Sequence, residues 1–394
     1  MLKQAKVQYY ANEIQSSQGD QKQLFNITKM LVGESKEVIL PTSESPKNLA
    51  QSFSDFFVDK IEQSRTDIGK SDMSEESNND EFEKHFEGEK LSVFGPSSES
   101  EVKSIIQKSP NKSCELDPIP TWLLKNCIDE LSPILTRLFN ISLENAYVPL
   151  DLKSAIVRPL IKKPGLDKNV YKNYRPVSNL PFISKVLEKV VDKRIETHLN
   201  IHSLHEPQQS AYKKFHSTET ALVRVQNDIL QALDNNENTV LLMLDLSAAF
   251  DTIDHQKLLS RLENHFGITG TPLKWMNSYL NERYQTVSID GELSKPVRMT
   301  YSVPQGSVLG PKNYILYTKP VGAICKKHGL NHHFYADDSQ LYMTFKPKDL
   351  NSKQKALQNI ESCLIDIVQW MNTNLLKLNA EKTEVILAVY AKTK

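Results

Sequence analysis

Two adjacent carboxylates, Asp337 and Asp338, stand in the stretch HHFYADDSQLYMTF among aromatic and apolar residues. A carboxylate in apolar surroundings is costly, and two neighbours that repel each other cost more, so a cation is needed to compensate them. The chain has no Lys or Arg between Lys327 and Lys346. A bound metal ion is therefore the first interpretation of the pair.

A third carboxylate, Asp245, interrupts the apolar run VLLMLDL, which is typical of a strand buried on both faces. The sequence shows no partner for it nearby. Successive side chains of a strand point to opposite faces, so Asp337 and Asp338 can converge only at a turn between FYA and SQLYM. Three carboxylates on adjacent strands would hold two Mg²⁺ ions about 3.5–4 Å apart, the arrangement for in-line phosphoryl transfer.

Hydrophobic periodicity predicts the elements that must position these side chains. Residues 1 to about 65 are expected to be helical, with apolar positions at Leu24, Ile27, Met30 and Leu31. Strands are predicted in AIVRPLI and in a hairpin around the DG of YQTVSIDGELSKP. Further helices are predicted in SSESEVKSIIQKS, between DPIP and Pro149, in FISKVLEKVVDKRIETHL, in STETALVRVQNDILQALDNN with Ser217 as its cap, after QGSVLG and in ALQNIESCLIDIVQWMNTNLL.

Acidic and basic residues are distributed unevenly along the chain. The net charge is +0, yet acidic residues exceed basic ones in the first hundred residues and the reverse holds afterwards. The acid-rich stretch SDMSEESNNDEFEKHFEGEK predicts a flexible connector. The basic run KSAIVRPLIKKPGLDKNVYKNYRP is either a solvated face or a phosphate-binding surface.

Membrane and secreted classes are disfavoured. No run approaches the roughly 18 apolar residues that span a bilayer, and the N-terminus has no hydrophobic signal region. The chain is therefore expected to be soluble and intracellular. Its 4 cysteines are widely spaced, which favours reduced core thiols over a structural zinc site.

The motif YADD alone is only weak evidence of function, but other motifs accompany it along the sequence. Six motifs follow one another in order: NYRPVSNLPFISKVLEKVV, QSAYKKFHSTETAL, LLMLDLSAAFDTIDH, SVPQGSVLGP, FYADDSQLY and LLKLNAEKTE. Together they closely resemble the reverse transcriptase of non-LTR (LINE-type) retrotransposons, nearest the chicken-repeat-like group, from about residue 90 to the end. The resemblance implies an α+β right-hand polymerase with fingers, an antiparallel palm sheet backed by helices, and a helical N-terminal segment.

The resemblance also implies an order of regions. Residues 1–68 match a helical segment that joins endonuclease to polymerase, 69–92 the acidic flexible connector, 93–236 the N-terminal extension and fingers, and 237–394 the palm. The chain ends before the primer-grip hairpin and thumb that the family places next, and no endonuclease precedes the joining segment, so we expect a reading frame cut from a longer element. Lys312 and Asn313 replace residues that are more often apolar, and Phe215 replaces a usual Gly.

The catalytic roles come from the resemblance. Asp245, Asp337 and Asp338 match the family's ligands for two Mg²⁺ ions, or Mn²⁺ in their place, and the backbone carbonyl of Leu246 is a further expected ligand. Lys382 matches a lysine proposed to protonate the leaving pyrophosphate, a task suited to a charged donor. The alternative for Lys382 is an ordinary surface lysine.

The fingers residues match a clasp for the incoming triphosphate. Arg175 of YRP and the lysines Lys162 and Lys163 match residues that bind the nucleotide's phosphates. A planar guanidinium suits bidentate contact with a phosphate. For the two lysines a solvated surface is an equal alternative.

Three palm residues match the nucleotide and template site. Phe250 matches an aromatic ring under the nucleotide sugar, which leaves neither room nor a partner for a 2′-hydroxyl and so favours a DNA product. Its alternative role is core packing. Gln305 and Gly306 match the loop that touches template and nucleotide, where Gly permits close approach of the backbone.

The implied activity is that of an RNA-directed DNA polymerase, which adds deoxynucleotides to a primer 3′-hydroxyl with Mg²⁺. Its expected partners are an RNA template, a DNA primer and deoxynucleoside triphosphates, with no membrane, and its oligomeric state is not indicated. As a ribonucleoprotein it would occupy the cytoplasm and the nucleus. One alternative is a weak or inactive nucleic-acid-binding remnant of such an element. Another is an RNA-dependent RNA polymerase, which Phe250 disfavours.

Overall fold

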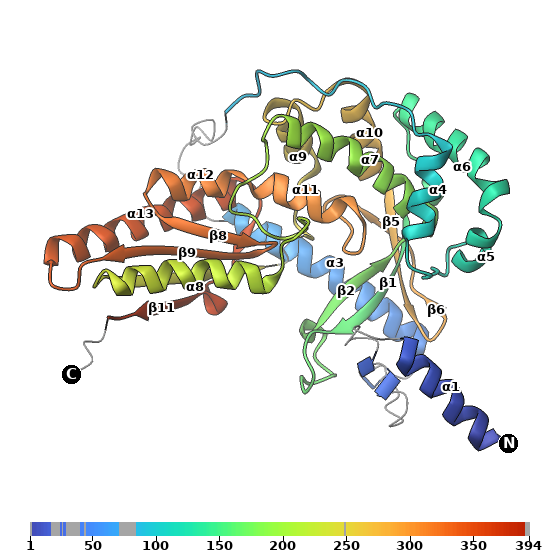
Figure 1. The fold of residues 1–394 in the computed structure, drawn as a ribbon, viewed down its shortest axis with the longest axis horizontal. Helices are drawn as coiled ribbons and strands as arrows, with labels where there is room; N and C mark the ends of the chain where they lie inside the picture. Colours follow the sequence, from blue (N-terminus) through green and yellow to red (C-terminus); the bar gives the residue numbers. More distant parts are fainter. Residues whose placement is uncertain are drawn as a thin grey trace. The chain divides into compact units, whose positions relative to one another are not determined.

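The computed structural model describes residues 2–16, 24–25, 27–28, 40–42, 45–70, 84–247 and 250–390 (Figure 1). The predicted helical positions Met30 and Leu31 lie outside these residues, as does the acidic stretch 71–83. The chain divides into two compact units. One consists of Met1–Thr42 and Ile161–Asn173, and the other of Ser43–Leu160 and Tyr174–Lys394.

The smaller unit combines an N-terminal helix with a loop from later in the chain. It contains α1 (Leu2–Ser16) and the short 3-10 helix η3 (Tyr171–Asn173). The backbone N–H of Lys162 donates to the carbonyl of Asn173 (2.9 Å), and the N–H of Thr42 donates to Asn169 Oδ1 (3.4 Å). These bonds close the loop and join it to the segment near residue 42.

The palm sheet of the larger unit is antiparallel throughout, with strand order β11-β3-β9-β8. Its strands are β3 (Asn238–Leu244), β8 (Asn331–Tyr335), β9 (Asp338–Phe345) and β11 (Glu384–Ala388). A second ribbon pairs β4 (Leu246–Ser247) with β10 (Lys377–Leu378), and the 3-10 helix η4 (Ala380–Lys382) follows it. The predicted antiparallel palm sheet is therefore confirmed.

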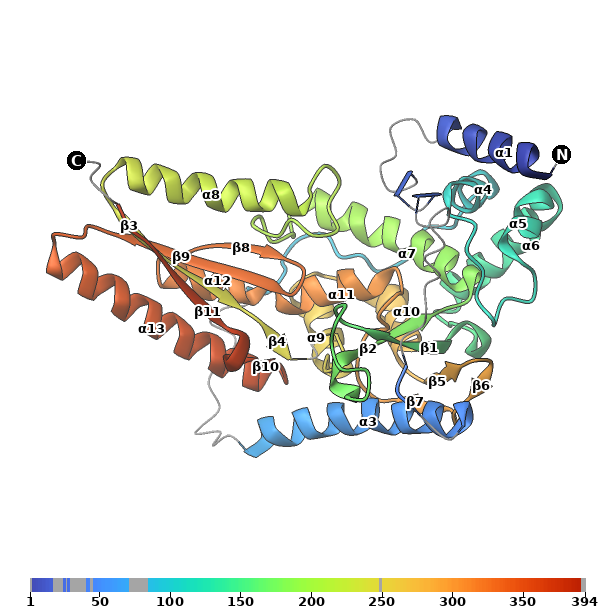
Figure 2. The ribbon, with the colours of Figure 1, turned by 90° about the horizontal axis from the view of Figure 1, so that it is seen from below.

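Helices cover both faces of the palm sheet. Figure 2 shows α8 (Thr218–Asp234) on one face and α13 (Leu350–Thr373) on the other, and α12 (Pro320–Lys327) contacts β8. Leu241 packs in a cluster with Val225 of α8, whereas Leu242 and Leu244 belong to the main core. Because successive side chains alternate between faces, β3 is buried on both, as its apolar run predicted.

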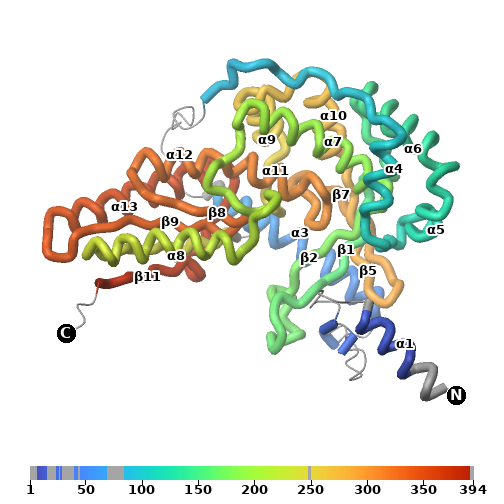
Figure 3. The backbone as a smooth tube through the Cα atoms, viewed as in Figure 1, coloured from blue at the N-terminus to red at the C-terminus, as the bar shows by residue number. Residues whose placement is uncertain are grey.

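The fingers sheet joins strands from distant parts of the chain. It has the order β2-β1-β5-β6, with β7 paired to β5, and consists of β1 (Ser154–Ile161), β2 (Tyr174–Asn179), β5 (Arg283–Ile289), β6 (Glu292–Leu293) and β7 (Val297–Met299). β1 and β5 run parallel, and Figure 3 shows them side by side. The predicted DG hairpin forms between β5 and β6, and α3 (Pro46–Lys70) packs on both strands.

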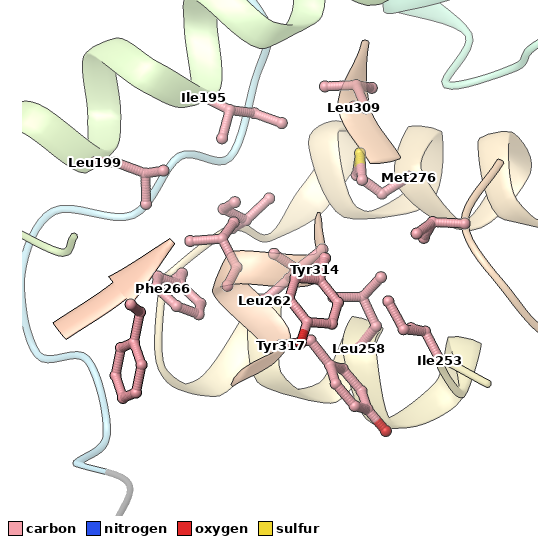
Figure 4. Packing of buried hydrophobic residues seen from close by; sticks show 14 of the residues in the cluster. Ile195, Leu199, Ile253, Leu258, Leu262, Phe266, Met276, Leu309, Tyr314 and Tyr317 are labelled. Atoms are coloured by element: carbon pink, nitrogen blue, oxygen red, sulfur yellow. The ribbon is translucent and has the colours of Figure 1, made fainter. Parts of the chain in front are cut away.

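The remaining helices surround the main core. They are α4 (Glu99–Lys108), α5 (Thr121–Asn126), α6 (Ile128–Glu144), the 3-10 helix η2 (Leu150–Leu152), α7 (Phe182–Ile201), α9 (His255–Asn264), α10 (Gly270–Leu280) and α11 (Leu309–Thr318). Figure 4 shows Leu199, Leu262 and Tyr317 converging in this core from α7, α9 and α11. The predicted cap Ser217 accepts a hydrogen bond from the N–H of Thr220, and the predicted α+β class is confirmed.

Part of the predicted flexible connector is packed against the larger unit. The N–H of Phe86 donates to the carbonyl of Asn264 (2.8 Å), and the N–H of Leu91 donates to that of Gly267 (2.9 Å). The Phe86 ring also meets His198 of α7 and His202, the residue that follows this helix, edge-on. Residues 84–92 are therefore held in place by hydrogen bonds that their acidic composition did not indicate. The domain boundaries expected from the sequence remain a prediction.

Two further sequence expectations concern cysteines and membranes. All four cysteines are unpaired thiols, and Cys325 and Cys363 are buried. None of the helices in the described part of the chain has both the length and the apolar character that crossing a bilayer requires.

Candidate active site

A tight hairpin carries the two adjacent aspartates. β8 ends at Tyr335, which pairs with Asp338 at the start of β9, so the connecting loop is Ala336 and Asp337 alone. The predicted turn is confirmed. Both aspartate side chains are exposed, so the expectation of apolar surroundings was wrong: the apolar neighbours alternate into the faces of the sheet, while the loop projects to solvent.

Asp245 lies at the same end of the sheet. It directly follows β3, whose last residue, Leu244, pairs with Ser339 next to Asp338. The carboxylate of Asp245 accepts a hydrogen bond from Asn379 Nδ2 (2.8 Å) and lies 3.6 Å from Lys382 Nζ. The sequence showed no partner for Asp245, because these two residues come from a segment more than a hundred positions later.

The charges of the three carboxylates act on one another. The side chain of Asp338 is exposed yet partly desolvated by its neighbours, and this desolvation, followed by the negative charges of Asp337 and Asp245, raises its pKa. A bound cation would remove that repulsion. Carboxylate oxygens are the ligands that Mg²⁺ prefers, so this set of donors fits a hard divalent cation.

The carboxylates are not gathered into a closed metal cage. Among the described residues, no group of three or more His, Cys, Asp or Glu side chains is arranged to hold a metal ion. Leu246, whose carbonyl was the further expected ligand, begins β4 and pairs with Leu378. Asp245, Asp338 and Lys382 line a cavity of about 360 Å³, together with Ala221 and Leu222 of α8.

An aromatic stack lies near the same carboxylates. The ring of Phe250 stacks on that of Tyr314 with 4.7 Å between centroids and 26° between planes. Tyr314 is buried, and its burial, followed by the charge of Asp337 and that of Asp338, raises its pKa well above the ordinary tyrosine value. Phe250 is only partly buried, so its ring is held in place by Tyr314 yet reaches the surface.

The Gln305–Gly306 loop lies against β2. The N–H of Ser178 donates to the carbonyl of Gln305 (2.9 Å), and Gln305 Nε2 donates to Asp251 Oδ1 (2.9 Å). Gly306 has a φ of +114°, and a Cβ at this position would collide with the carbonyl oxygen of Ser178. The close approach at Gly306 joins this loop to β2, the strand that carries Arg175, while the predicted approach to template and nucleotide stays a prediction.

A buried carboxyl group anchors the helix that follows this loop. Glu188 is 1% exposed, and its Oε2 accepts from the N–H groups of Val308 (2.8 Å) and Leu309 (2.9 Å) and from the hydroxyl of Tyr279 (3.1 Å). Leu309 begins α11, so Glu188 satisfies N–H groups that a helix start leaves open. Burial raises the pKa of Glu188 despite these bonds and the nearby Arg283.

The predicted phosphate clasp divides between the two units. Arg175 is an exposed residue of β2 in the larger unit. Lys162 and Lys163 belong to the smaller unit, where Lys162 Nζ donates to the carbonyl of Lys172 (2.7 Å). Their common role stays a prediction.

The departures from the family pattern have visible consequences. Lys312 Nζ forms ion pairs with Asp192 (2.6 Å) and Glu196 (2.7 Å), which compensate its charge in α11. Asn313 is buried, and its Nδ2 has no hydrogen-bond partner within the described part of the chain. Phe215 is 99% exposed and has a φ of +62°, a conformation that explains why Gly is usual there.

Three residues at the site were missed from the sequence. Tyr314 supports Phe250, Asn379 binds Asp245, and Gln209 hydrogen-bonds to Ala336 in the hairpin loop. Asn379 and Gln209 stand inside two of the motifs, LLKLNAEKTE and QSAYKKFHSTETAL. A polar residue within such a motif was the available signal, but its partner is set by the fold.

Comparison with known proteins gives concordant matches. Residues 161–393 match the family described as Reverse transcriptase (RNA-dependent DNA polymerase). The RNA-directed DNA polymerase from mobile element jockey of Drosophila melanogaster is 31% identical over 291 residues, which are 72% of this chain and 31% of that protein. The probable RNA-directed DNA polymerase from transposon BS of the same species is 28% identical over 288 residues, 72% of this chain and 30% of that protein.

A solved structure is also similar. Apo telomerase from Candida tropicalis, truncated from the C-terminal domain, has a TM-score of 0.41 and 12% identity and covers 70% of this chain and 65% of that one. The chain spans about a third of the length of the two curated relatives.

Proposed function

Because the chain belongs to the reverse transcriptase (RNA-dependent DNA polymerase) family, we propose that it adds deoxynucleotides to the 3′-hydroxyl of a primer paired with an RNA template. One observation carries this proposal. The hairpin loop with Asp337 and Asp338 and the end of β3 with Asp245 lie at one end of one sheet. The Phe250–Tyr314 stack stands beside them, since the Asp337 charge acts on Tyr314.

The carboxylates are assigned to divalent cations. Asp245, Asp337 and Asp338 would hold two Mg²⁺ ions, or Mn²⁺, with the carbonyl of Leu246 as a further ligand. When bound, such ions activate the attacking hydroxyl and neutralise the charge of the leaving pyrophosphate. Support comes from the all-oxygen donor set and from the charges of Asp337 and Asp245, which add to desolvation in raising the pKa of Asp338.

Lys382 is assigned the role of proton donor to the leaving pyrophosphate. Its Nζ lies 3.6 Å from Asp245 Oδ2, so its ammonium group is already directed to the carboxylates. Its side chain is 64% exposed, which leaves it free to turn from Asp245 to a departing phosphate. Lys382 lies on η4, whose backbone is tied to Asp245 through Asn379, and this position supports the role.

The nucleotide itself is assigned to the remaining residues. Phe250 would lie under the sugar and exclude a 2′-hydroxyl, while Gln305 and Gly306 would contact the template and the nucleotide. Arg175 would bind the triphosphate, and Lys162 and Lys163 of the smaller unit are assigned a phosphate-binding role of their own. Support comes from the hydrogen bond that joins the Gln305 loop to the strand of Arg175 and from the exposed guanidinium on that strand.

A primer-extension assay tests this function. The chain is incubated with poly(rA)/oligo(dT), Mg²⁺ and dTTP, and in parallel with UTP. We expect extension with dTTP that needs the metal and is much weaker with UTP. Binding of the primer–template without any extension would favour a nucleic-acid-binding remnant, and efficient extension with UTP would favour an RNA polymerase.

A further inference from the structure

The hairpin loop before the two aspartates has an unusual backbone. In this two-residue loop φ is positive at Ala336 (+57°) and not at Asp337. This is the pattern of a type II′ turn, whose first loop residue is normally Gly. A side chain with a Cβ disfavours this conformation. Some other contact must therefore stabilise the turn that sets the direction of Asp337 and Asp338.

The side chain of Gln209 makes that contact. Its Oε1 accepts from the N–H of Ala336 (3.1 Å), and its Nε2 donates to the carbonyl of Ala336 (3.4 Å). The same Oε1 accepts from the N–H of Ala211 (2.9 Å), and the residue is 4% exposed. Both polar groups of the Ala336 backbone are thus bound by one buried amide.

The backbone around Gln209 is fixed to the same hairpin. The N–H of Phe334 donates to the carbonyl of Gln208 (2.9 Å), and the N–H of Ser210 donates to the carbonyl of Phe334 (3.0 Å). Gln209 and Phe334 form a parallel bridge. Since residues 208–210 run alongside β8, the backbone of Gln209 cannot move relative to the hairpin without breaking these bonds.

We propose that Gln209 is a positioning residue that holds the strained loop of the hairpin and thereby sets Asp337 and Asp338 for a divalent cation. A side-chain amide offers an acceptor to the N–H and, from a second atom, a donor to the carbonyl of the same residue, and the side chain of Asn is one methylene shorter than that of Gln. That this turn serves to bind a divalent cation rests on the proposed function. The strain and the amide contact stand without it.

A set of variants of the whole chain tests this role. Gln209→Met keeps the length of the side chain and removes its two hydrogen bonds to Ala336 together with the one from Ala211, while Ala336→Gly removes the strain. The two are made singly and together. The matched control is Gln208→Met, because the bond from Phe334 uses the Gln208 backbone and survives the change.

The first measurement needs no activity. Mn²⁺ binding is followed by the electron paramagnetic resonance of free Mn²⁺, without nucleotide or primer. We expect Gln209→Met to weaken Mn²⁺ binding roughly tenfold, the size of effect expected for two lost hydrogen bonds. In the Ala336→Gly background the same change should weaken binding less than about threefold, and Gln208→Met should leave it unchanged. An equal loss in both backgrounds, or none, overturns the proposal.

The second measurement is urea unfolding of the unchanged chain, Gln209→Met, Ala336→Gly and the double variant. Gln209→Met should destabilise the chain more when residue 336 is Ala than when it is Gly. With Gly the turn is not strained, so the amide of Gln209 has no strain to offset. If Gln209→Met alone does not fold but the double variant does, the proposal is supported; if neither folds, it is overturned. If the unchanged chain binds no Mn²⁺ and extends no primer, the proposed function fails. If the changes in unfolding free energy caused by Gln209→Met and Ala336→Gly simply add in the double variant, the role of Gln209 is overturned.

Discussion

Asn379 holds Asp245 at two points. Its Nδ2 donates to Oδ2 of the carboxylate, and its backbone N–H donates to the Asp245 carbonyl, both at 2.8 Å. The carbonyl of Asn379 in turn accepts from the N–H of Lys382 (3.1 Å). One amide residue therefore fixes the position of Asp245 and of the turn that carries Lys382.

Removing the side chain of Asn379 should slow the reaction without unfolding the chain. A hydrogen bond to a charged group contributes about 1.5–3 kcal/mol, so Asn379→Ala should lower the rate constant of single-nucleotide addition roughly 10- to 100-fold. The backbone bond to Asp245 remains, so the melting temperature should change little. Asn351→Ala, at an exposed position of α13, is the matched control; equal rates for the two variants would contradict the role of Asn379.

Each of the three aspartates should be indispensable for extension. Asp245→Asn, Asp337→Asn and Asp338→Asn each remove a charged ligand, which should lower the rate roughly a thousandfold or more. Binding of the primer–template should stay close to that of the unchanged chain. Asp290→Asn, in the β5–β6 turn, is the matched control, and any of the three variants that keeps a tenth of the normal rate contradicts the assignment.

The stacked ring of Phe250 should decide between deoxynucleotides and ribonucleotides. Phe250→Val opens space for a 2′-hydroxyl, and the discrimination that is lost should be roughly 30- to 1000-fold. The measurement is the ratio of incorporation efficiencies for dTTP and UTP. Tyr314→Phe is the matched control, because it keeps the stack and should keep the ratio. A ratio that Phe250→Val leaves unchanged would show that Phe250 has a packing role alone.

Stability should depend on pH through Glu188. Burial raises its pKa in the folded chain above the ordinary value of 4.5, so the folded state binds a proton more tightly than the unfolded state. The contribution of Glu188 to the free energy of unfolding is therefore complete below pH 4.5 and is lost as the pH rises through the folded pKa. Glu188→Gln removes this titration.

The measurement is urea unfolding of both proteins from pH 4 to pH 8. The free energy of unfolding of the unchanged chain, minus that of Glu188→Gln, should fall as the pH rises and then level off. Glu188→Leu removes the acceptor for the N–H groups of Val308 and Leu309 and should destabilise the chain at every pH. A difference that is constant over the whole range would contradict the raised pKa.

Local patterns in the sequence were sufficient for much of the fold. The buried strand before Asp245, the DG hairpin and the cap Ser217 depend on alternation, turn residues and capping, all of which act between near neighbours. The turn that brings Asp337 beside Asp338 also follows from two adjacent aspartates between strand-like runs. Motif order then placed these elements in one family.

Contacts between distant segments could not be predicted in the same way. Nothing in the sequence pairs Gln209 with Ala336 or Asn379 with Asp245, because an amide can bind any polar partner that the fold brings to it. The packing of residues 84–92 was missed for the same reason, since acidic composition describes a segment in water and not its neighbours. The exposure of Asp337 was missed because its apolar neighbours in the sequence lie in the two strands, whereas Asp337 itself lies in the two-residue loop between them.

The parallel pairing of β1 with β5 has a consequence for how the chain folds during synthesis. Ser154 pairs with Tyr284, and α3, made still earlier, packs on the same late strand. At about 5–20 residues per second, a ribosome needs on the order of ten seconds to pass from β1 to β5. Through that delay β1 has an unpaired edge of the kind that recruits chaperones or other nascent chains, so the emergence of β5 sets when this whole layer closes.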